Sequence, residues 1–500
     1  AGDPYLKGLL SLLEDIEEVE PEVPETTVLQ PERTHLYLSA GSNEVSVSEL
    51  CEKMNREVHT EAGLTDQIDE VGYKGESANP MTHKALYLHH KNDDVATFML
   101  SVKKRLRFRD AEKNSRKYEK NKGFGKQMFK ILQQTYNLVH PNSLPELDRC
   151  EAEFTRKRIA KSRNLIEKHS YRSDPDWPSN YLKIFLKQQV CTKMEKRGVD
   201  AKAGQTIACF SHAVLCRFGP QLRRTEKALR AQLGDNVMIY SQKNYTDLDN
   251  WSRLYVDGMI GTDSDYEAFD RSQDEKILSF EVEVLKFFLW PEELINEYVT
   301  LKLMMGCSMG DLAIMRFSGE FGTFFFNTIC NMVFTCMRYC ITKDTPICYA
   351  GDDMYAPGVL QVKSDYEHVL KELQLKAKVQ VSTSPLFCGW RMTPYGIVKD
   401  PNLLLDRWKM AKRDGKLDLC MINYALEAVY GYRLGEHLYD VNIDIDAQQE
   451  LVREIVKVKD KLPKNVSKQF SKDPNECFSD GEELDLRVSP EGTFQGEQEV

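Results

Sequence analysis

Residues 347–356, Ile-Cys-Tyr-Ala-Gly-Asp-Asp-Met-Tyr-Ala, form the stretch of sequence that decides the fold. Apolar segments flank Gly351, Asp352 and Asp353, so the pattern predicts two strands joined by a tight turn that carries two carboxylates. Adjacent carboxylates at such a turn are suited to holding divalent metal ions. The same three residues also make an ordinary turn, because glycine adopts positive φ and aspartate bonds its own backbone. Other segments must decide between these two interpretations.

Composition indicates a soluble globular protein. The chain has 500 residues, of which 41% are hydrophobic and 29% are charged. Its formal net charge of −10 argues against a uniformly basic nucleic-acid binder, although it permits a basic channel on an acidic body. The 13 cysteines are an odd number without a repeated close spacing, which favours free thiols in a reducing compartment. The chain begins with Ala1 and shows no signal peptide, as expected of a processed product or a fragment of a longer chain.

A second acidic motif, Asp265-Tyr266-Glu267-Ala268-Phe269-Asp270, lies upstream. We expect a strand over residues 254–261 before it and an amphipathic helix over residues 275–288 after it. This order places the carboxylates at the end of a strand, where a backbone carbonyl can also join a metal shell. Taken alone, such a motif also fits a helix N-terminus, because aspartate caps helices well.

A third motif, Ser318-Gly319-Glu320-Phe321-Gly322-Thr323-Phe324-Phe325-Phe326-Asn327-Thr328, predicts a flexible loop that runs into a helix. Thr323 and Asn327 are four residues apart, so they share one helix face. They suit either hydrogen bonding to a sugar hydroxyl or satisfied polar groups in a core helix. The apolar run of residues 321–341 contains Asn, Thr and Arg, which favours a buried core helix over a membrane span.

In this order the three motifs resemble the palm of viral RNA-dependent RNA polymerases. Residues 265–274, 315–335 and 349–357 are similar to the polymerase motifs of plant alphavirus-like replicases, and residues 315–328 are most similar to the Betaflexiviridae of the order Tymovirales. The resemblance covers residues 181–401. It implies an α+β right-hand polymerase fold with fingers, palm and thumb, in which helices flank an antiparallel palm sheet.

The resemblance also implies a reaction, the template-directed addition of ribonucleotides to an RNA 3′ end by a two-metal mechanism. Such an enzyme replicates and transcribes a positive-strand RNA genome. Asp265 and Asp352 would be the main metal ligands, with Asp353 close by, and Mg²⁺ or Mn²⁺ would be the cofactor. Asp270 and Asn327 would meet the 2′-hydroxyl of the incoming NTP, together with Ser318, Gly319 and Thr323 of the third motif.

Basic residues extend the implied site on both sides. A segment before Ala203-Gly204-Gln205 looks like the family's basic fingers motif, which would hold triphosphate oxygens, with Lys202 as the best single candidate. Any single one of these residues could also be an exposed surface charge. Downstream, either Lys376 or Lys378 falls where related polymerases place a lysine that protonates pyrophosphate, and the sequence does not choose between them. The fingers candidates are Lys187, Lys193, Lys196, Arg197 and Lys202.

The expected organisation has five parts. Residues 1–35 form an acidic linker, 36–180 an N-terminal extension and fingers, 181–401 fingers and palm, 402–470 a thumb that looks helical, and 471–500 an acidic disordered tail. The basic run of residues 103–126 is interleaved with aromatic rings. It fits either a solvated helix face or a surface that contacts nucleic-acid phosphates.

The implied partners are the RNA template, the nascent RNA, NTPs, and the methyltransferase and helicase parts of the same polyprotein. This chain itself has no G-x-x-x-x-G-K-[ST] loop. The implied location is the host cytoplasm, in membrane-associated replication complexes that reach host membranes through other domains or partners.

Three alternatives compete with this interpretation. A reverse transcriptase would share the carboxylates, but the Asp270 and Asn327 pair and Gly351 argue against it. A non-catalytic RNA-binding scaffold would not need all its acidic positions intact. A zinc site is suggested by Cys209, His212 and Cys216, which lack a fourth ligand at a suitable spacing.

Overall fold

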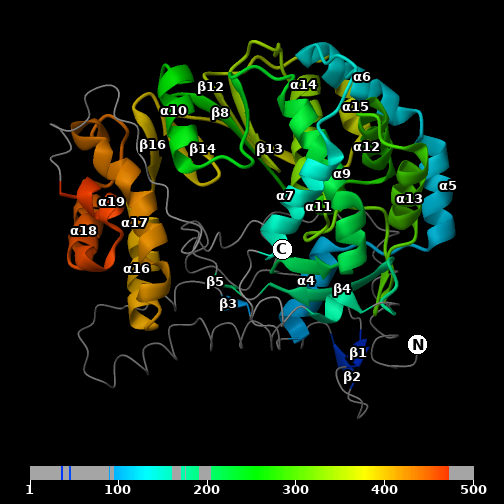
Figure 1. Cartoon of the computed structure of the whole chain (residues 1–500), viewed down its shortest axis with the longest axis horizontal. Coiled ribbons are helices and arrows are strands. Elements are labelled where there is room, and N and C mark those ends of the chain that lie inside the picture. The colour runs from blue at the N-terminus through cyan, green and yellow to red at the C-terminus, as the bar shows by residue number, and fades with distance from the viewer. Residues whose placement is uncertain are drawn as a thin grey trace.

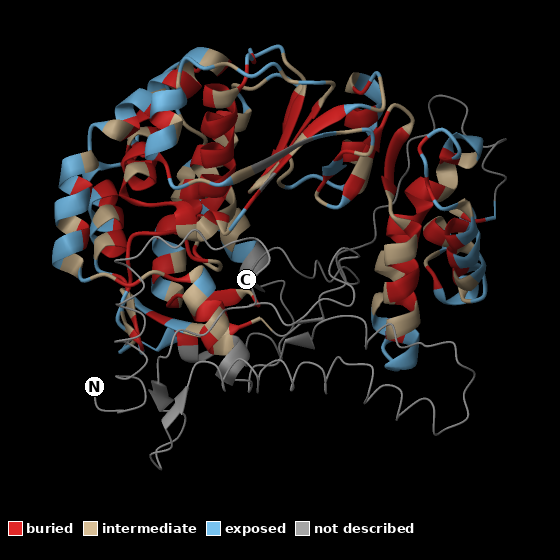
Figure 2. Cartoon of the chain, turned by 180° about the vertical axis from the view of Figure 1, so that it is seen from behind, coloured by how far each residue is buried: buried red, intermediate tan, exposed pale blue. Residues whose placement is uncertain are grey.

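The computed structural model describes residues 35–37, 44–46, 89–90, 95–159, 170–174, 176–187, 189–190 and 204–471 (Figure 1). Helices and sheets are mixed, as the α+β prediction requires. A sheet lies at the centre, N-terminal helices cover one side of the molecule, and the C-terminal helices form a lobe at the opposite end. Figure 2 shows that the central strands and the helix next to them are the most buried part.

The central sheet carries the acidic motifs. Its strand order is β13-β8-β12-β11-β7, and β11 and β12 form the predicted hairpin. Strands β8 and β13 continue the sheet antiparallel, but β7 runs parallel to β11, so the sheet is not wholly antiparallel as expected. The reason is connectivity, because β7 reaches β11 through a long crossover rather than a hairpin. The strands are β7 Val237–Ile239, β8 Gly261–Tyr266, β11 Ile347–Ala350, β12 Asp353–Pro357 and β13 Ala377–Ser382.

The strand predicted over residues 254–261 is wrong. Its first residues end helix α10 (Tyr245–Tyr255), which begins with a capping box between Asn244 and Asp247. Trp251 and Leu248 lie three residues apart and bury one face of this helix, so packing outweighs the extended preference of the residues that follow. Strand β8 starts only at Gly261. Asp265, the first aspartate of the second motif, therefore lies inside the strand rather than beyond its end.

Helix α14 (Thr323–Arg338) lies against the central sheet and is almost entirely buried, which confirms the core helix predicted in this region. Within the described residues, no helix combines the length and the apolar character that a bilayer crossing requires. Helix α12 (Glu275–Phe287) confirms the amphipathic helix predicted after the second motif. The other helices of this body are α4 Val95–Arg105, α5 Ala111–Asn121, α6 Phe124–Tyr136, α7 Leu147–Ile159, α9 His212–Arg230, α11 Phe269–Ser272, α13 Glu292–Leu303 and α15 Glu367–Glu372.

A second sheet has the order β10-β9-β4-β6 and supports the loop that precedes α14. The Ala208 N–H of β6 donates to the Ser318 carbonyl at 2.8 Å, which ties that loop to the sheet. The strands are β4 Tyr181–Leu186, β6 Thr206–Cys209, β9 Gly306–Cys307 and β10 Gly310–Asp311.

The C-terminal part begins with a three-stranded sheet and continues as helices, as predicted for residues 402–465. Trp390 is 1% exposed and packs in the cluster that joins this small sheet to the central one. The helices share a separate apolar core around Trp408. The elements are β14 Leu386–Phe387, β15 Trp390–Thr393, β16 Gly396–Lys399, α16 Pro401–Arg413, α17 Leu417–Arg433, α18 Ile445–Val456 and α19 Lys464–Gln469.

Candidate active site

Ala350 at the end of β11 pairs with Asp353 at the start of β12. The two residues between them, Gly351 and Asp352, form the turn that joins the strands. Gly351 has a φ of 60°, whereas Asp352 keeps a negative φ, the pattern of a hairpin turn with glycine at its first central position. A Cβ atom built at Gly351 would meet no atom within 4 Å. Glycine is therefore needed here for its backbone conformation and not for space.

Two polar residues of α14 hold this turn from below. The Thr328 hydroxyl accepts the Gly351 N–H at 3.0 Å. The Asn331 amide donates to the carbonyls of Gly351 at 3.1 Å and Asp353 at 3.0 Å, and it accepts the Tyr266 hydroxyl at 2.8 Å. Asn331 is 0% exposed, so these bonds lie in a dry environment where each one constrains the turn strongly.

The strand register brings the acidic positions together. The last paired residues of β12 and β8 are Met354 and Ser264, so the next positions along the two strands are Asp353 and Asp265. On the other side, β13 places Lys378 opposite Asp265. The side chains of Asp265 and Lys378 are outside the described atoms. Lys376 is exposed in the loop before β13, where its carbonyl accepts the Glu267 N–H at 3.0 Å.

The Asp353 carboxylate is held by a second hairpin. Its Oδ2 accepts the backbone N–H of Cys388 at 3.2 Å, and Cys388 has a φ of 50° in the turn between β14 and β15. Burial, followed by the charges of Asp353 and Asp352, holds the pKa of the Cys388 thiol well above its usual value. The two carboxylates therefore add to the effect of burial on this thiol.

The donor set suits a hard divalent cation. Asp352 and Asp353 supply carboxylate oxygens, Asp265 stands at the adjacent register position, and Mg²⁺ prefers such oxygen ligands. Among the side chains that the structure describes, no three His, Cys, Asp or Glu residues cluster closely enough to hold a metal ion. The Asp265 carboxylate, which would complete the set, is not among those side chains.

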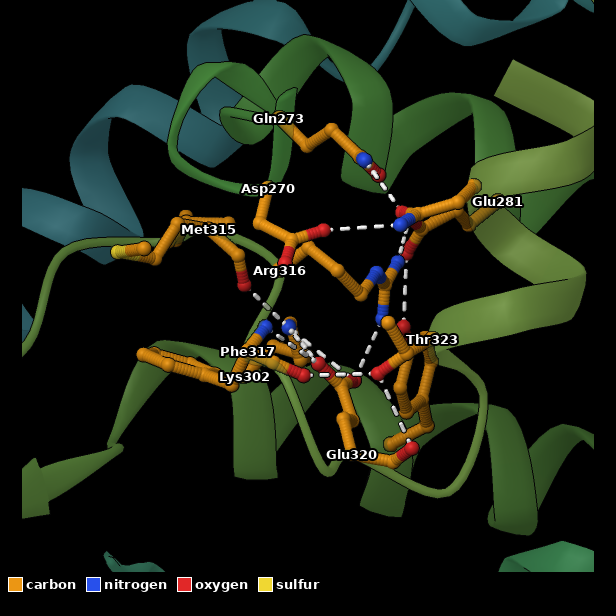
Figure 3. Close-up of polar contacts among 12 residues, drawn as sticks. Asp270, Gln273, Glu281, Lys302, Met315, Arg316, Phe317, Glu320 and Thr323 are labelled. Carbon is orange, nitrogen blue, oxygen red and sulfur yellow. Dashed lines mark hydrogen bonds and ion pairs between the residues drawn. The ribbon is translucent and has the colours of Figure 1, made fainter. Parts of the chain in front are cut away.

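Asp270 lies just beyond β8, at the start of α11, and α14 holds its carboxylate. The Asn327 Nδ2 donates to Asp270 Oδ1 at 2.8 Å, and the Gln273 Nε2 donates to Asn327 Oδ1 at 2.5 Å (Figure 3). Burial raises the pKa of Asp270, while the bond from Asn327 and the charge of Arg316 act in the opposite direction. One helix thus contacts both the aspartate of the second motif and the hairpin turn.

The remaining residues of the third motif shape its loop. The Thr323 hydroxyl donates to the Phe317 carbonyl at 2.7 Å, so its hydrogen stabilises the loop. The Ser318 hydroxyl accepts the Gln205 side-chain amide at 3.4 Å. Gly319 has a φ of 100°, which glycine adopts readily.

Glu320 of this loop belongs to a buried charge cluster that the sequence did not predict. Arg316 is 1% exposed and pairs with Glu281 and with Glu320, the latter at 2.6 Å (Figure 3). Lys302 bonds Glu320 at 2.9 Å and the Met315 carbonyl at 2.5 Å. The Arg316 N–H donates to the Asp270 carbonyl at 3.0 Å, which links the cluster to the second motif. The available signal was a single arginine inside the apolar stretch of residues 312–317.

Of the predicted fingers lysines, the structure places Lys187. It is half-buried after β4, and its N–H donates to the Gln205 carbonyl at 2.7 Å. Lys193, Lys196, Arg197 and Lys202 lie outside the described residues. The predicted basic run of residues 103–126 is divided between α4, α5 and the start of α6, and Arg107 turns inward to bond the Ile314 carbonyl at 2.8 Å.

Known proteins are similar to this chain in sequence. The family model described as RNA dependent RNA polymerase matches residues 69–414. The chain is 68% identical over 483 residues to the RNA replication protein of Grapevine virus A (isolate Is 151), which covers 97% of this chain and 28% of that protein. It is 44% identical over 359 residues to the RNA-directed RNA polymerase of Apple chlorotic leaf spot virus (isolate apple), covering 72% and 19%.

The RNA replication polyprotein of Citrus leaf blotch virus is 40% identical over 481 residues, covering 94% of this chain and 24% of that protein. The chain therefore spans 19% to 28% of the length of these three relatives. The relatives confirm the resemblance to the Betaflexiviridae that the motifs indicated.

Proposed function

Because the chain belongs to the RNA-dependent RNA polymerase family, we propose that it adds ribonucleoside monophosphates to an RNA 3′ end under the direction of a template. In this proposal it replicates and transcribes a positive-strand RNA genome. The observation that supports the proposal is the strand register, which sets the backbone position of Asp265 beside that of Asp353, next to the turn that carries Asp352. Asn327 fixes the carboxylate of Asp270, as sugar recognition would require.

The proposed architecture is a right hand. The central sheet with α14 would be the palm, and the C-terminal helices of residues 402–470 would be the thumb, which agrees with their separate apolar core. The second sheet and the N-terminal helices would be the fingers. The three-stranded sheet of β14, β15 and β16 would join palm to thumb, since it packs on the central sheet and its last strand directly precedes α16.

Asp265 and Asp352 would hold the divalent ions, Mg²⁺ or Mn²⁺, with Asp353 beside them. When bound, such ions activate the 3′-hydroxyl and neutralise the leaving pyrophosphate. The chain's own contribution is fixed geometry. Thr328 and Asn331 hold the turn that carries Asp352, and the Cys388 N–H orients the Asp353 carboxylate.

Asp270 would accept a hydrogen bond from the 2′-hydroxyl of the incoming nucleotide. A site built to bond a hydroxyl rejects the analogue that lacks it, because its buried polar group is then left unpaired. Asn327 would keep the Asp270 carboxylate in place for this contact. The same pair argues against a reverse transcriptase, which must accept a deoxyribose.

Two sets of basic residues would contact the triphosphate or its leaving pyrophosphate. Lys378 stands opposite Asp265 in the register, whereas Lys376 lies in the loop, and this favours Lys378 as the proton donor to pyrophosphate. Lys187 and the fingers residues Lys193, Lys196, Arg197 and Lys202 would hold triphosphate oxygens.

The whole replication machinery extends beyond this chain in the proposal. Its relatives are several times longer and carry the names replication protein and replication polyprotein. Methyltransferase and helicase parts would belong to the same polyprotein. Replication would take place in the host cytoplasm, in membrane-associated complexes whose membrane contact comes from other domains or partners.

The test is incorporation of labelled NTPs on an RNA template–primer with Mg²⁺. Wild type, Asp352→Asn and Asp257→Asn would be compared. Asp257 is an exposed aspartate before β8, so its replacement removes the same charge at a position away from the turn and serves as the control. We expect extension by wild type and Asp257→Asn and none by Asp352→Asn. A folded wild type that binds RNA but extends nothing with Mg²⁺ or Mn²⁺ would instead support the RNA-binding scaffold.

A further inference from the structure

Gln273 has no part in the reaction described above, yet it is linked to Asp270 through Asn327. It lies between α11 and α12 and is 2% exposed. Its Nε2 donates to Asn327 Oδ1 at 2.5 Å, and Asn327 Nδ2 donates to Asp270 Oδ1 at 2.8 Å (Figure 3). The three side chains form a relay in which each amide passes on one hydrogen bond.

The direction of this relay follows from the charge of Asp270. An ionised carboxylate only accepts hydrogen bonds, so Asn327 must turn its NH₂ group towards Asp270. The oxygen of the same amide then faces Gln273, which must donate. The reverse also holds, because a donor at position 273 favours the orientation of Asn327 in which Asp270 is an acceptor.

Gln273 is an unusual choice for packing alone. Its Oε1 is a buried oxygen without a hydrogen-bond partner among the described residues, and such an atom costs stability. A leucine or methionine would fill the same space without this cost. The amide is therefore retained for the bond that it donates.

The surroundings of Asp270 act on the ionisation of its carboxylate in opposite directions. Arg316 and Arg105 favour the ionised carboxylate, while Glu320 and burial oppose it. Gln273 is neutral, so it changes the orientation of Asn327 without adding a charge of its own.

We propose that Gln273 is a positioning residue for sugar selection, which fixes the Asn327 amide so that Asp270 remains an acceptor for the 2′-hydroxyl of the incoming nucleotide. The inference rests on the proposed function of this site. Gln273 acts through Asn327 and does not touch the nucleotide itself.

Gln273→Glu tests the direction of the relay with almost no change of shape. The new carboxylate cannot donate, so the Asn327 amide rotates to donate to it and turns its oxygen towards Asp270. Two acceptors then face each other unless Asp270 takes up a proton. The repulsion displaces the Asp270 carboxylate in the first case, and the proton removes its charge in the second, so in both cases its hydrogen bond from the nucleotide weakens. Gln273→Met removes the donor but gives Asn327 no reason to rotate.

The measurement is the ratio of kcat/KM for NTP to that for the matching 2′-dNTP on an RNA template–primer. Equilibrium binding of the same two nucleotides to the chain is measured in parallel. We expect Gln273→Glu to lower the ratio on the order of tenfold, the value of one hydrogen bond, and Gln273→Met to lower it less. The loss falls on NTP, and use of dNTP changes little. Gln448→Glu is the control, because Gln448 is 5% exposed in α18 and places the same charge in another buried position.

Several results would overturn the inference. These are an unchanged ratio in both folded variants, an equal loss for NTP and dNTP, or a wild type that binds the two nucleotides equally. If Gln273→Glu does not fold, the ratio for Gln273→Met decides. A wild type that prefers NTP in binding but incorporates nothing refutes the proposed polymerase, while the binding ratios of the variants still decide the relay.

Discussion

Replacing Asn331 tests how the hairpin turn between β11 and β12 is held. Asn331→Ala removes three buried hydrogen bonds, to the carbonyls of Gly351 and Asp353 and from the Tyr266 hydroxyl. At about 1 kcal/mol net for each bond, we expect the free energy of unfolding to fall by about 3 kcal/mol. Urea unfolding followed by tryptophan fluorescence measures this loss.

A double-mutant cycle separates the bonds from general damage at this position. Tyr266→Phe alone leaves the Asn331 oxygen without its donor, and we expect a loss of about 1 kcal/mol. In the double variant that bond has already been removed, so the two losses should overlap by about 1 kcal/mol. Losses that add to within about 0.3 kcal/mol would refute the contact between these two side chains.

Activity should fall further than stability alone explains. The amide fixes both ends of the turn that carries Asp352, and a shift of about 1 Å near a reacting centre costs about 100-fold in rate. We expect Asn331→Ala to lose about that factor in NTP incorporation at a temperature where it remains folded. A folded variant with full activity would mean that the turn keeps its position without this amide.

Three further predictions concern neighbouring features. Gly351→Ala and Gly358→Ala both place a Cβ at positive φ in open space, so each should cost about 1 to 2 kcal/mol in urea unfolding, but only Gly351→Ala should reduce incorporation; equal activities would contradict this. Arg316→Met should cost about 3 to 5 kcal/mol because it leaves buried carboxylates unpaired, whereas Arg217→Met at an exposed ion pair should cost less than about 1 kcal/mol; similar values would refute the distinction. Burial raises the pKa of Asp270, so its carboxylate takes up a proton as the pH falls through that raised value, and the preference for NTP over dNTP should weaken towards acid pH; a constant ratio would contradict its role as acceptor.

Local signals in the sequence were enough for the hairpin and for α14. Gly351 and its two aspartates lie between short apolar segments, and the helix that follows Gly322 is long and apolar enough to be recognised from neighbouring residues alone. The spacing of four residues between Thr323 and Asn327 correctly placed both on one helix. Such features depend on residues close together in the chain.

The failures involve residues whose partners lie far away. The strand predicted over residues 254–261 failed because its first residues pack as the end of α10. Arg316 and Glu281 are 35 positions apart and Gln273 and Asn327 are 54 apart, so no periodic pattern connects them. From the sequence alone, Asn331 indicates only that the apolar run of residues 321–341 is a core helix rather than a membrane span. Its bonds to the hairpin turn depend on how the helix meets the sheet, which only the tertiary structure reveals.

Helix α14 has one consequence for how this site can vary. Asn327 contacts Asp270, and on the same helix its neighbour Thr328 and Asn331, one turn further along, hold the hairpin. A small rotation or slide of α14 therefore displaces both groups together. In the proposed polymerase this couples the choice of sugar to the rate of addition. Variants that change the preference for NTP over dNTP through α14 should therefore also change the rate of nucleotide addition.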